Sequence, residues 1–509
     1  MTPLWKTLPS ASQGTPFAPD AHHDVIVVGA GLTGLSTAVM LAREGRDVAV
    51  VEAGAIAELA SGGNTGKLSV LQGDRLSRIR RHHPASLVRA YVDANRAGMR
   101  WLTSFADEAG VPYLRRTDHS YAASTDGMDA LQRVHDAARE AGLPVRMLAA
   151  GDLSTSPFPA AGAVALDDQV TIDPVRVAQA LVGELLAAGG TLHTGVRVIG
   201  THALPHPRIQ TAAGSLFADH VVLATGTPTI DRGLYFAKVR GMRSYCVSFR
   251  VPGRLPEATF ISIDDQTRSI RPVSDSDGPA GTAQLVVGGN GHPVGRSDGE
   301  KAAVEDLIEW TTRFFPGAEE THRWSAQDYE SHNLIPFVGA MPRSLGRIRF
   351  ATGYAKWGLS NAPAAALRLT AEILGTPRHE RSRWMTTIGT RLTVPADLGR
   401  GAIEGAKVAA ELASGWRDAE STSVPVARPS EGHGVVANTS GRPVGVSTVD
   451  GVTRAVDAVC THLGGVLDWN DAECTWDCPL HASRFAPDGT RIEGPAVRDL
   501  KSRPRHGGQ

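Results

Sequence analysis

Two short Cys/His motifs near the C-terminus of this 509-residue sequence could bind metal. The first is Cys460-x-His462 and the second is Cys478-x-x-His481. Zinc, an iron–sulfur cluster and chance composition are the three alternatives. Zinc fingers favour like ligands within one motif, whereas each motif here combines one Cys with one His. A [2Fe–2S] cluster of mixed ligation needs this combination, because two Cys bind one iron and two His bind the other.

A glycine-rich turn near the N-terminus is the second group of residues whose types and spacing could serve a chemical function. Gly29-x-Gly31-x-x-Gly34 lies between an apolar run and an amphipathic pattern, and Glu52 ends the next apolar run. These glycines permit a tight turn, close approach of the backbone to a pyrophosphate and close packing of helix on strand. Free N–H groups of the helix would face the phosphates, and Glu52 would accept hydrogen bonds from ribose hydroxyls. The motif predicts a dinucleotide but does not separate NAD from FAD.

Hydrophobic periodicity indicates the elements that must position these residues. Residues 24–54 predict strand, turn, helix and strand, and residues 173–189 predict a helix with Pro174 in its first turn. Alternating runs over about 241–291 predict a second, sheet-rich domain. Residues 347–375 again predict strand, turn and helix.

Three segments resemble the D-amino-acid oxidase-like flavoprotein superfamily, which includes glycine and sarcosine oxidases. They are ELASGGNTGKLSVLQG at 58–73, ADHVVLATGTP at 218–228 and FATGYAKWGLSNAP at 350–363. The resemblance implies bound FAD, held without a covalent bond because the late segment has no Cys. It implies further cofactor contacts at Ser61, Gly62, Lys67, Val198, Ala224, Gly226, Gly353, Trp357, Gly358 and Leu359. Two positions depart from the family pattern, namely Asn333, where many relatives have Asp, and the run NAP at 361–363.

The segments CTHLGG, WDCP and HASRF resemble the Rieske family over about residues 431–500. The resemblance implies a [2Fe–2S] cluster with Cys460, His462, Cys478 and His481 as its ligands. Respiratory-type members have two more Cys joined in a disulfide, and Gly465 and Leu480 stand at those positions here. Cys474 is expected to be a buried thiol. Ser483 matches a residue that can donate a hydrogen bond to the cluster, which raises its potential.

The predicted fold class is α/β: a Rossmann-type FAD-binding domain with an interleaved antiparallel-sheet substrate domain, followed by an all-β Rieske domain. The predicted boundaries are an irregular N-terminal lead at 1–22, the FAD-dependent oxidoreductase at 23–395, a linker at 396–427, the Rieske domain at 428–500 and a disordered tail at 501–509. Within the oxidoreductase, the FAD-binding parts are about 23–75, 150–230 and 330–375, and the substrate-domain sheet is about 231–330.

Five residues are candidates for contact with substrate. Lys356 lies in the late segment, where a cation would favour reduced flavin or oxygen activation. Arg271 is either a clamp for a substrate carboxylate or an ordinary surface arginine. Arg243 and Tyr245 alternate with apolar neighbours, so they face the pocket or serve packing, and His292 is either a pocket base or a structural histidine. The predicted catalytic set is Lys356, Arg271 and Tyr245.

The complete architecture resembles a bacterial family of FAD-dependent oxidoreductases with a fused Rieske module. Flavin accepts two electrons as a hydride, whereas a Rieske centre passes one at a time, so together they convert two-electron into one-electron transfer. The resemblance implies oxidation of a C–N bond in a small amine or amino acid, with electrons leaving to a one-electron acceptor or partner redox protein. Two alternatives remain: an electron-transfer flavoprotein feeding a partner oxygenase, and a redox-sensing, non-catalytic protein.

Composition and hydropathy limit the possible partners and the possible cellular location of the protein. Lys+Arg 52 against Asp+Glu 53 give a formal net charge of −1, so there is no overall attraction to nucleic acid or anionic membrane. No run is long and apolar enough to span a bilayer, and the N-terminus lacks a signal-like apolar segment. Two of the four Cys lie in the metal-like motifs, which fits a reducing compartment. We expect a cytoplasmic protein without nucleic-acid binding or membrane insertion.

Overall fold

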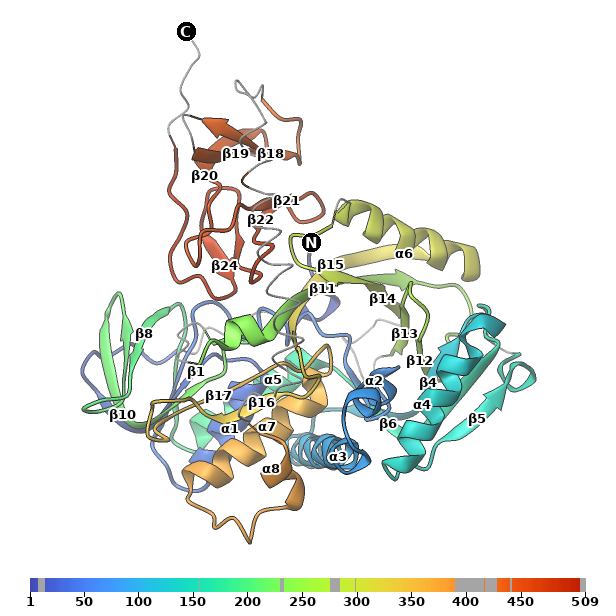
Figure 1. Cartoon of the computed structure of the whole chain (residues 1–509), viewed down its shortest axis with the longest axis horizontal. Helices are drawn as coiled ribbons and strands as arrows, with labels where there is room; N and C mark the ends of the chain where they lie inside the picture. Colours follow the sequence, from blue (N-terminus) through green and yellow to red (C-terminus); the bar gives the residue numbers. More distant parts are fainter. Residues whose placement is uncertain are drawn as a thin grey trace.

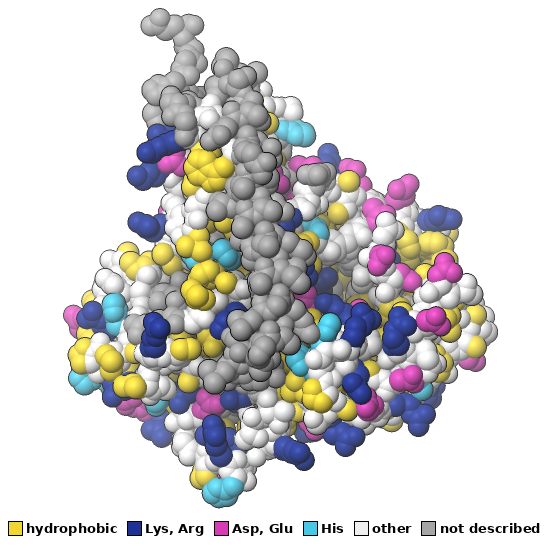
Figure 2. All heavy atoms as spheres, in the orientation of Figure 1, with side chains coloured by type: hydrophobic (Ala, Val, Ile, Leu, Met, Phe, Trp, Pro, Cys, Tyr) yellow, Lys and Arg dark blue, Asp and Glu magenta, His cyan; other side chains and the backbone are white. Residues whose placement is uncertain are grey.

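A computed structural model describes residues 1–503 apart from 8–13, 155, 229–232, 275–283, 298, 390–427 (where residue 416 alone is described) and 440–441. The predicted linker at 396–427 therefore lies outside the described residues except for residue 416, as do residues 504–509 of the predicted tail. Within the described residues no helix has the length and apolarity to cross a membrane. Figure 2 shows Lys and Arg side chains interspersed with Asp and Glu over the visible face.

The first sheet carries the glycine-rich turn. Its strands follow the order β16-β17-β10-β1-β2-β7, and β8 and β9 extend it beside β10. The bounds are β1 His22–Val28, β2 Val48–Val51, β7 Thr191–His193, β8 Val198–His202, β9 Arg208–Thr211, β10 Gly214–Leu223, β16 Phe337–Ala340 and β17 Ile348–Thr352. Strands β1, β2, β7, β10 and β17 are parallel. The apolar run at 25–28 is buried, as expected for a parallel strand covered on both faces.

Helices pack against this sheet and against one another. They are α1 (Leu32–Arg43), α3 (Ala85–Glu108), α5 (Pro174–Ala187) and α7 (Gly358–Ile373). Helix α5 begins at Pro174 because the carboxylate of Asp173 accepts hydrogen bonds from the N–H groups of Val175 and Arg176. The shorter helices are α2 (Arg75–His82), α4 (Met128–Glu140) and α8 (Arg383–Thr387).

The second sheet has nine strands in the order β15-β11-β14-β13-β12-β4-β6-β3, with β5 beside β6. Its bounds are β3 Lys67–Leu68, β4 Tyr113–Ala122, β5 Arg146–Ala149, β6 Gly162–Ile172, β11 Val239–Arg250, β12 Thr259–Ser262, β13 Arg268–Val273, β14 Gln284–Pro293 and β15 Glu319–Ser331. The sheet thus includes strands from 67–172 as well as the segment 231–330 expected from the sequence. Helix α6 (Glu300–Phe314) packs on β11 and β14 (Figure 1).

The N-terminal lead contains a short buried element. Leu4–Thr7 form a 3₁₀ helix, and Leu4 and Trp5 are fully buried. Trp5 Nε1 donates to the carbonyl of Asn64 at 2.7 Å, and the Arg271 guanidinium lies 4.7 Å from the Trp5 ring centre. This part of the N-terminal segment is therefore ordered, although the sequence predicts an irregular segment at 1–22. The order follows from Trp5, because its indole packs between the second sheet and the loop before β3.

The C-terminal region is all-β. Strands β18 (Gly434–Thr439), β19 (Arg442–Val449) and β20 (Val452–Asp457) form one small sheet. Strands β21 (Asp468–Asn470), β22 (Thr475–Asp477), β23 (Arg484–Phe485) and β24 (Arg491–Glu493) form another. Trp469, Trp476 and Phe485 lie in the shared core. Figure 1 shows this region standing above β11 and β15 of the second sheet.

Candidate cofactor sites

The glycine-rich turn joins β1 to α1 with the close contacts that its residue types require. Gly29 has φ 107°, and a Cβ there would lie 2.6 Å from the carbonyl oxygen of Ala224. A Cβ on Gly34 would overlap the carbonyl oxygen of Gly29, and one on Gly31 would lie 3.0 Å from Ser61 Oγ. Ser61 Oγ accepts a hydrogen bond from Leu32 N at 3.1 Å. Gly29, Gly31, Gly34, Ser61 and Ala224 therefore meet in one place.

Glu52 closes the same site from the end of β2. Its Oε2 accepts from Ala30 N at 2.7 Å and its Oε1 from Gly54 N at 2.8 Å. The side chain is thus held beside the turn, where a ribose would lie. Glu52 and Gly31 are partly exposed although the strands before them are buried. This open, glycine-lined cradle beside an acid fits the adenosine and pyrophosphate half of FAD.

A second turn, at 353–357, approaches from β17 and leads into α7. Gly353, Ala355 and Lys356 all have positive φ, at 88°, 50° and 73°. Tyr354 Oη lies 3.0 Å from Thr33 Oγ1 of α1 and so ties this turn to the first one. Trp357, at the start of α7, is nearly buried, whereas Gly358 is partly exposed and Leu359 is buried. The free N–H groups of α7 suit an anionic edge of reduced flavin.

A buried amide and hydroxyl network holds the start of α7 in place. Gln72 Nε2 donates to Asn95 Oδ1 at 2.9 Å and to Ser360 Oγ at 3.2 Å, and Tyr91 Oη donates to Gln72 Oε1 at 2.7 Å. Asn361 Nδ2 donates to the carbonyl of Trp357 at 2.9 Å and reaches Tyr91 Oη at 3.3 Å. The unusual NAP run thus has a local role. Sequence reasoning missed Asn95 and Tyr91, because nothing along helix α3 marks them.

The remaining predicted FAD contacts are distributed around these turns. Gly226 has φ 74° and follows β10, and Thr352 Oγ1 donates to its carbonyl. Gly62 is buried, and a Cβ there would overlap the carbonyl of Ala57. Lys67 is buried in β3 and donates to the carbonyl of Phe260 at 3.1 Å, and burial lowers its pKa. Val198 begins β8 and packs into the core of the first sheet.

Lys356 is exposed and lies over one face of the second sheet. A Cβ on Gly291 would meet its Nζ, and Ser244 Oγ lies beside the same point. The backbone N–H of Lys356 donates to Asp328 Oδ2. Burial raises the pKa of Asp328 to about 6, although the Lys356 charge and this hydrogen bond act in the opposite direction. Asp328, which the sequence did not single out, therefore joins Lys356 as a titratable group beside the late turn.

Arg271 reaches the same face of the sheet but is fully buried. Its Nη1 donates to the carbonyl of Thr65 at 2.6 Å and its Nη2 to that of Ile172 at 3.4 Å. These bonds and the contact with the Trp5 ring fix the loop at 61–66 against β13. The geometry therefore gives Arg271 a role in holding that loop.

Tyr245 and Arg243 lie on the opposite face, because successive side chains of β11 alternate. Tyr245 packs with Val304 and Leu307 of α6, and its Oη donates to His292 Nε2 at 3.1 Å. His292 Nδ1 in turn donates to the carbonyl of Pro293 at 2.9 Å, and burial lowers the His292 pKa. This arrangement suits a neutral, structural imidazole behind the sheet.

The four predicted cluster ligands lie on two facing loops, between β20 and β21 and between β22 and β23. Cys460 and Cys478 are buried thiols. A shared hydrogen bond between them lowers the pKa of Cys460 to about 7 and raises that of Cys478, and the Ser483 hydroxyl also lowers the pKa of Cys460. The rings of His462 and His481 are 5.2 Å apart, between centres.

The state of the His481 ring suits a mixed-ligand cluster. His481 Nδ1 is buried without a hydrogen-bond partner, and burial lowers the His481 pKa to about 4, which keeps the ring neutral for binding iron. In the described part of the chain no three His, Cys, Asp or Glu side chains surround a single metal position. A Rieske cluster requires only two protein ligands at each iron. A Cβ on Gly465 would lie 2.7 Å from the Leu480 side chain, so apolar packing stands where respiratory-type members have a disulfide.

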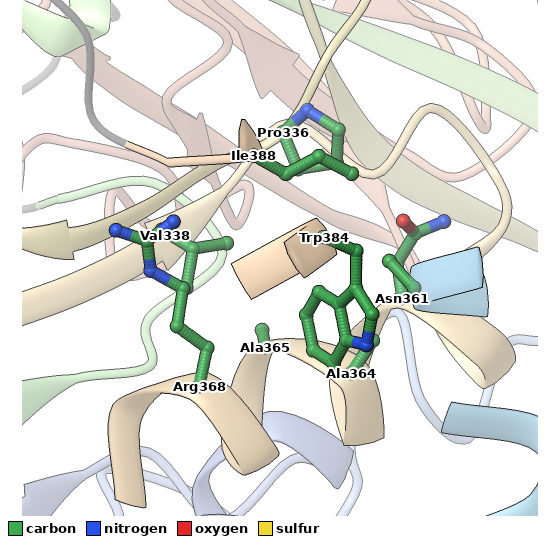
Figure 3. Close-up of a pocket in the computed structure, with 9 residues that line it drawn as sticks. Pro336, Val338, Asn361, Ala364, Ala365, Arg368, Trp384 and Ile388 are labelled. Atoms are coloured by element: carbon green, nitrogen blue, oxygen red, sulfur yellow. The ribbon is translucent and has the colours of Figure 1, made fainter. Parts of the chain in front are cut away.

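A small cavity lies beside α7, and Figure 3 shows its lining. Its volume is about 20 Å³, room for one water molecule. Asn361, Ala365 and Arg368 of α7 line it together with Trp384 and Ile388. It is too small for flavin.

Comparison with known proteins agrees with this geometry. The FAD dependent oxidoreductase family model matches residues 24–372, and the Rieske [2Fe-2S] domain model matches residues 422–504. The chain therefore belongs to the FAD-dependent oxidoreductase family and has a C-terminal Rieske domain, and its cofactors are FAD and a [2Fe–2S] cluster. The predicted fold class, family, enzyme class and cofactors are confirmed.

Individual relatives cover the two halves together or separately. The Rieske 2Fe-2S iron-sulfur protein YhfW of Bacillus subtilis is 26% identical over 98% of this chain and 96% of its own length. Glycine oxidase of Bacillus licheniformis is 25% identical over 70% of this chain and 94% of its own. The crystal structure of glycine oxidase from Geobacillus kaustophilus covers 73% of this chain and 99% of its own, with TM-score 0.61 and 22% identity.

Proposed function

We propose that this oxidoreductase removes a hydride from the carbon beside the nitrogen of a small amine or amino acid and exports the electrons singly through its Rieske cluster. One observation carries the second half of the proposal: Phe236, eight residues after the segment at 218–228, lies edge-on to the rings of both His462 and His481, at 4.9 Å between ring centres in each case. The cluster site therefore faces the domain that binds flavin.

Glycine oxidase among the relatives supports the substrate class. FAD supplies the hydride acceptor, and the product imine hydrolyses in water. We assign to Asp328 the proton that a substrate ammonium must lose before hydride transfer, because its carboxylate lies beside the late turn and its pKa of about 6 lies near neutrality. Lys356 adds a positive charge beside the late turn, which favours reduced flavin. Arg271 and Tyr245 act through the loop at 61–66 and through α6 rather than by touching substrate.

An anaerobic absorbance titration of the holoprotein tests the proposal. The panel consists of amines, N-methyl amino acids and NAD(P)H. We expect an amine to bleach the flavin and then to lower the absorbance of the oxidised cluster. Reduction by NAD(P)H or an added reductase alone would overturn the amine assignment and favour an electron-transfer flavoprotein that feeds a partner oxygenase.

A further inference from the structure

A buried arginine of the second sheet binds the C-terminal domain. Arg243 on β11 is fully buried. Its Nη1 donates to Glu473 Oε2 at 2.7 Å and to Ser325 Oγ at 2.8 Å. Its Nη2 donates to Gln327 Oε1 at 2.9 Å and lies 3.3 Å from Asp477 Oδ2. Ser325 and Gln327 belong to β15, whereas both carboxylates belong to the Rieske domain.

The two carboxylates are shared with an arginine of the Rieske domain itself. Arg484 Nη2 lies 2.5 Å from Glu473 Oε2, and its Nε lies 3.6 Å from Asp477 Oδ1. Burial alone would raise the pKa of Glu473, but Arg484 and Arg243 hold it at about 2. A buried group of this kind contributes little net stability when complete, yet losing one member leaves an unpaired buried charge. Such a cluster specifies one placement of the two domains.

The same surface holds the second ligand loop directly. Gln327 Nε2 donates at 2.8 Å to the carbonyl of Ala482, which is the residue after His481. Arg296 Nε donates to the carbonyl of Pro479 at 2.9 Å. Gly241 of β11 permits the approach, because a Cβ there would overlap the Ala482 side chain. These two hydrogen bonds and this close contact, together with the ring contact between Phe236 and His481, connect the loop at 478–482 with the oxidoreductase domain.

A packed line of residues leads from this loop to the predicted flavin contacts. Gln327 Nε2 also donates to Tyr329 Oη at 3.0 Å. The ring of Tyr329 lies 3.5 Å from the point where a Cβ on Gly226 would be. Gly226 is one of the predicted flavin contacts, and Ala482 adjoins the predicted ligand His481. The two cofactor sites are therefore joined through side chains in contact.

We propose that Arg243 is a positioning residue that docks the Rieske domain in one fixed placement, with both cluster histidines facing the flavin domain. Electrons then cross between the cofactors at a constant separation, without a swing of the Rieske domain. The meaning of this docking for catalysis rests on the proposed function. The docking itself does not, and chemical reduction tests it without any substrate.

The test compares Arg243→Met with Arg268→Met in the full-length holoprotein. Arg268 is the matched control, because it is a buried arginine of the same sheet whose ion pair with Asp306 of α6, at 2.5 Å, stays within the oxidoreductase domain. After partial reduction with dithionite, the microwave saturation of the flavin radical signal reports its distance from the reduced cluster. Rapid mixing measures the rate at which flavin electrons reach the cluster.

Loss of a buried ion pair shifts the ratio of docked to undocked domain on the order of a hundred-fold, so we expect Arg243→Met to slow flavin-to-cluster transfer by about ten-fold or more. We also expect its radical signal to saturate at lower power, while Arg268→Met keeps both properties. Wild-type saturation and rate in a folded Arg243→Met protein with both cofactors would overturn the proposal. If that variant fails to fold, Glu473→Gln replaces it, because glutamine keeps the side-chain shape. Glu473→Gln must then show the same changes in saturation and rate. Wild-type saturation and rate in Glu473→Gln would overturn the proposal.

Discussion

Burial raises the pKa of the Asp328 carboxyl group, whereas the neighbouring Lys356 charge lowers it. The pKa is raised to about 6, above its ordinary 3.8, so the carboxyl is ionised only when the pH exceeds about 6. If Asp328 takes the substrate proton, flavin reduction at subsaturating amine should rise as pH increases through 6. We expect Asp328→Asn to lose this limb and to slow reduction by about a hundred-fold or more. Stopped-flow flavin bleaching between pH 5 and 8 measures this pH dependence. If the rate of Asp328→Asn still rises through pH 6, a different group is responsible for the titration.

Ser483 offers a second residue-scale prediction, at the cluster. Its hydroxyl lowers the pKa of Cys460, so it stabilises negative charge on that sulfur. Hydrogen bonds to cluster sulfurs raise the reduction potential because reduction adds negative charge. We expect Ser483→Ala to lower the potential by roughly 60 mV, the equivalent of a hydrogen bond worth about 1.4 kcal/mol. A redox titration followed by EPR measures the shift. Ser447→Ala, a buried serine of the small sheet on β19, should leave it unchanged.

Among the elements, the 3₁₀ helix at Leu4–Thr7 connects parts that are distant in sequence. Trp5 bonds to the carbonyl of Asn64 and stacks on Arg271, so it holds the loop at 61–66 that carries predicted FAD contacts. We expect Trp5→Ala to lower the free energy of unfolding by about 3–5 kcal/mol and to weaken FAD binding. Thermal unfolding and the FAD content after dialysis measure these effects. Trp101→Ala, on the partly exposed face of α3, should retain FAD; if Trp5→Ala also retains it, the loop is held by other contacts.

Local pattern was sufficient to predict the elements around the glycine-rich turn and the late turn. Each is a strand, a glycine and a helix in immediate succession, so sequence spacing alone fixes their geometry. The membership of the second sheet was not predictable in this way. Strand β4 pairs with β6 on one side and with β12 on the other, and the partners Asp118 and Thr259 of the second pairing are about 140 residues apart in sequence. Such pairings depend on tertiary packing, which no short pattern records.

The orientation of β11 illustrates why the candidate site was only partly predictable. Tyr245 packs toward α6, whereas Cys246 packs toward Trp5 and Trp324. Both faces of the strand are buried, so alternation between polar and apolar residues cannot tell which face meets the flavin. The alternation of Arg243 with apolar neighbours therefore fits a pocket position and a packing position equally well. Its partners Glu473 and Asp477 lie more than two hundred residues away in sequence, and only the folded chain brings them together.

At the scale of the whole molecule, the two cofactor sites divide one reaction between them. The flavin domain contains the residues proposed to act on substrate, and the Rieske domain is docked on the opposite face of the second sheet from Lys356. The proposed function therefore makes the two half-reactions separable: removing the cluster should leave hydride transfer to flavin intact and block export of single electrons. Neither domain alone would catalyse the coupled reaction.

The Cys460→Ala variant tests this division. We expect it to lose the [2Fe–2S] absorbance and EPR signal but to keep the rate of flavin reduction by amine within about two-fold, because Cys460 touches none of the residues proposed to act on substrate. Turnover with a one-electron acceptor such as ferricyanide should fall by at least about ten-fold, since flavin then lacks its single-electron outlet. Cys474→Ala is the matched control, a half-buried thiol in the same domain and outside the ligand motifs, and it should retain both signals. Undiminished turnover in the cluster-free Cys460→Ala protein would show that electrons leave directly from flavin and that the cluster serves another purpose.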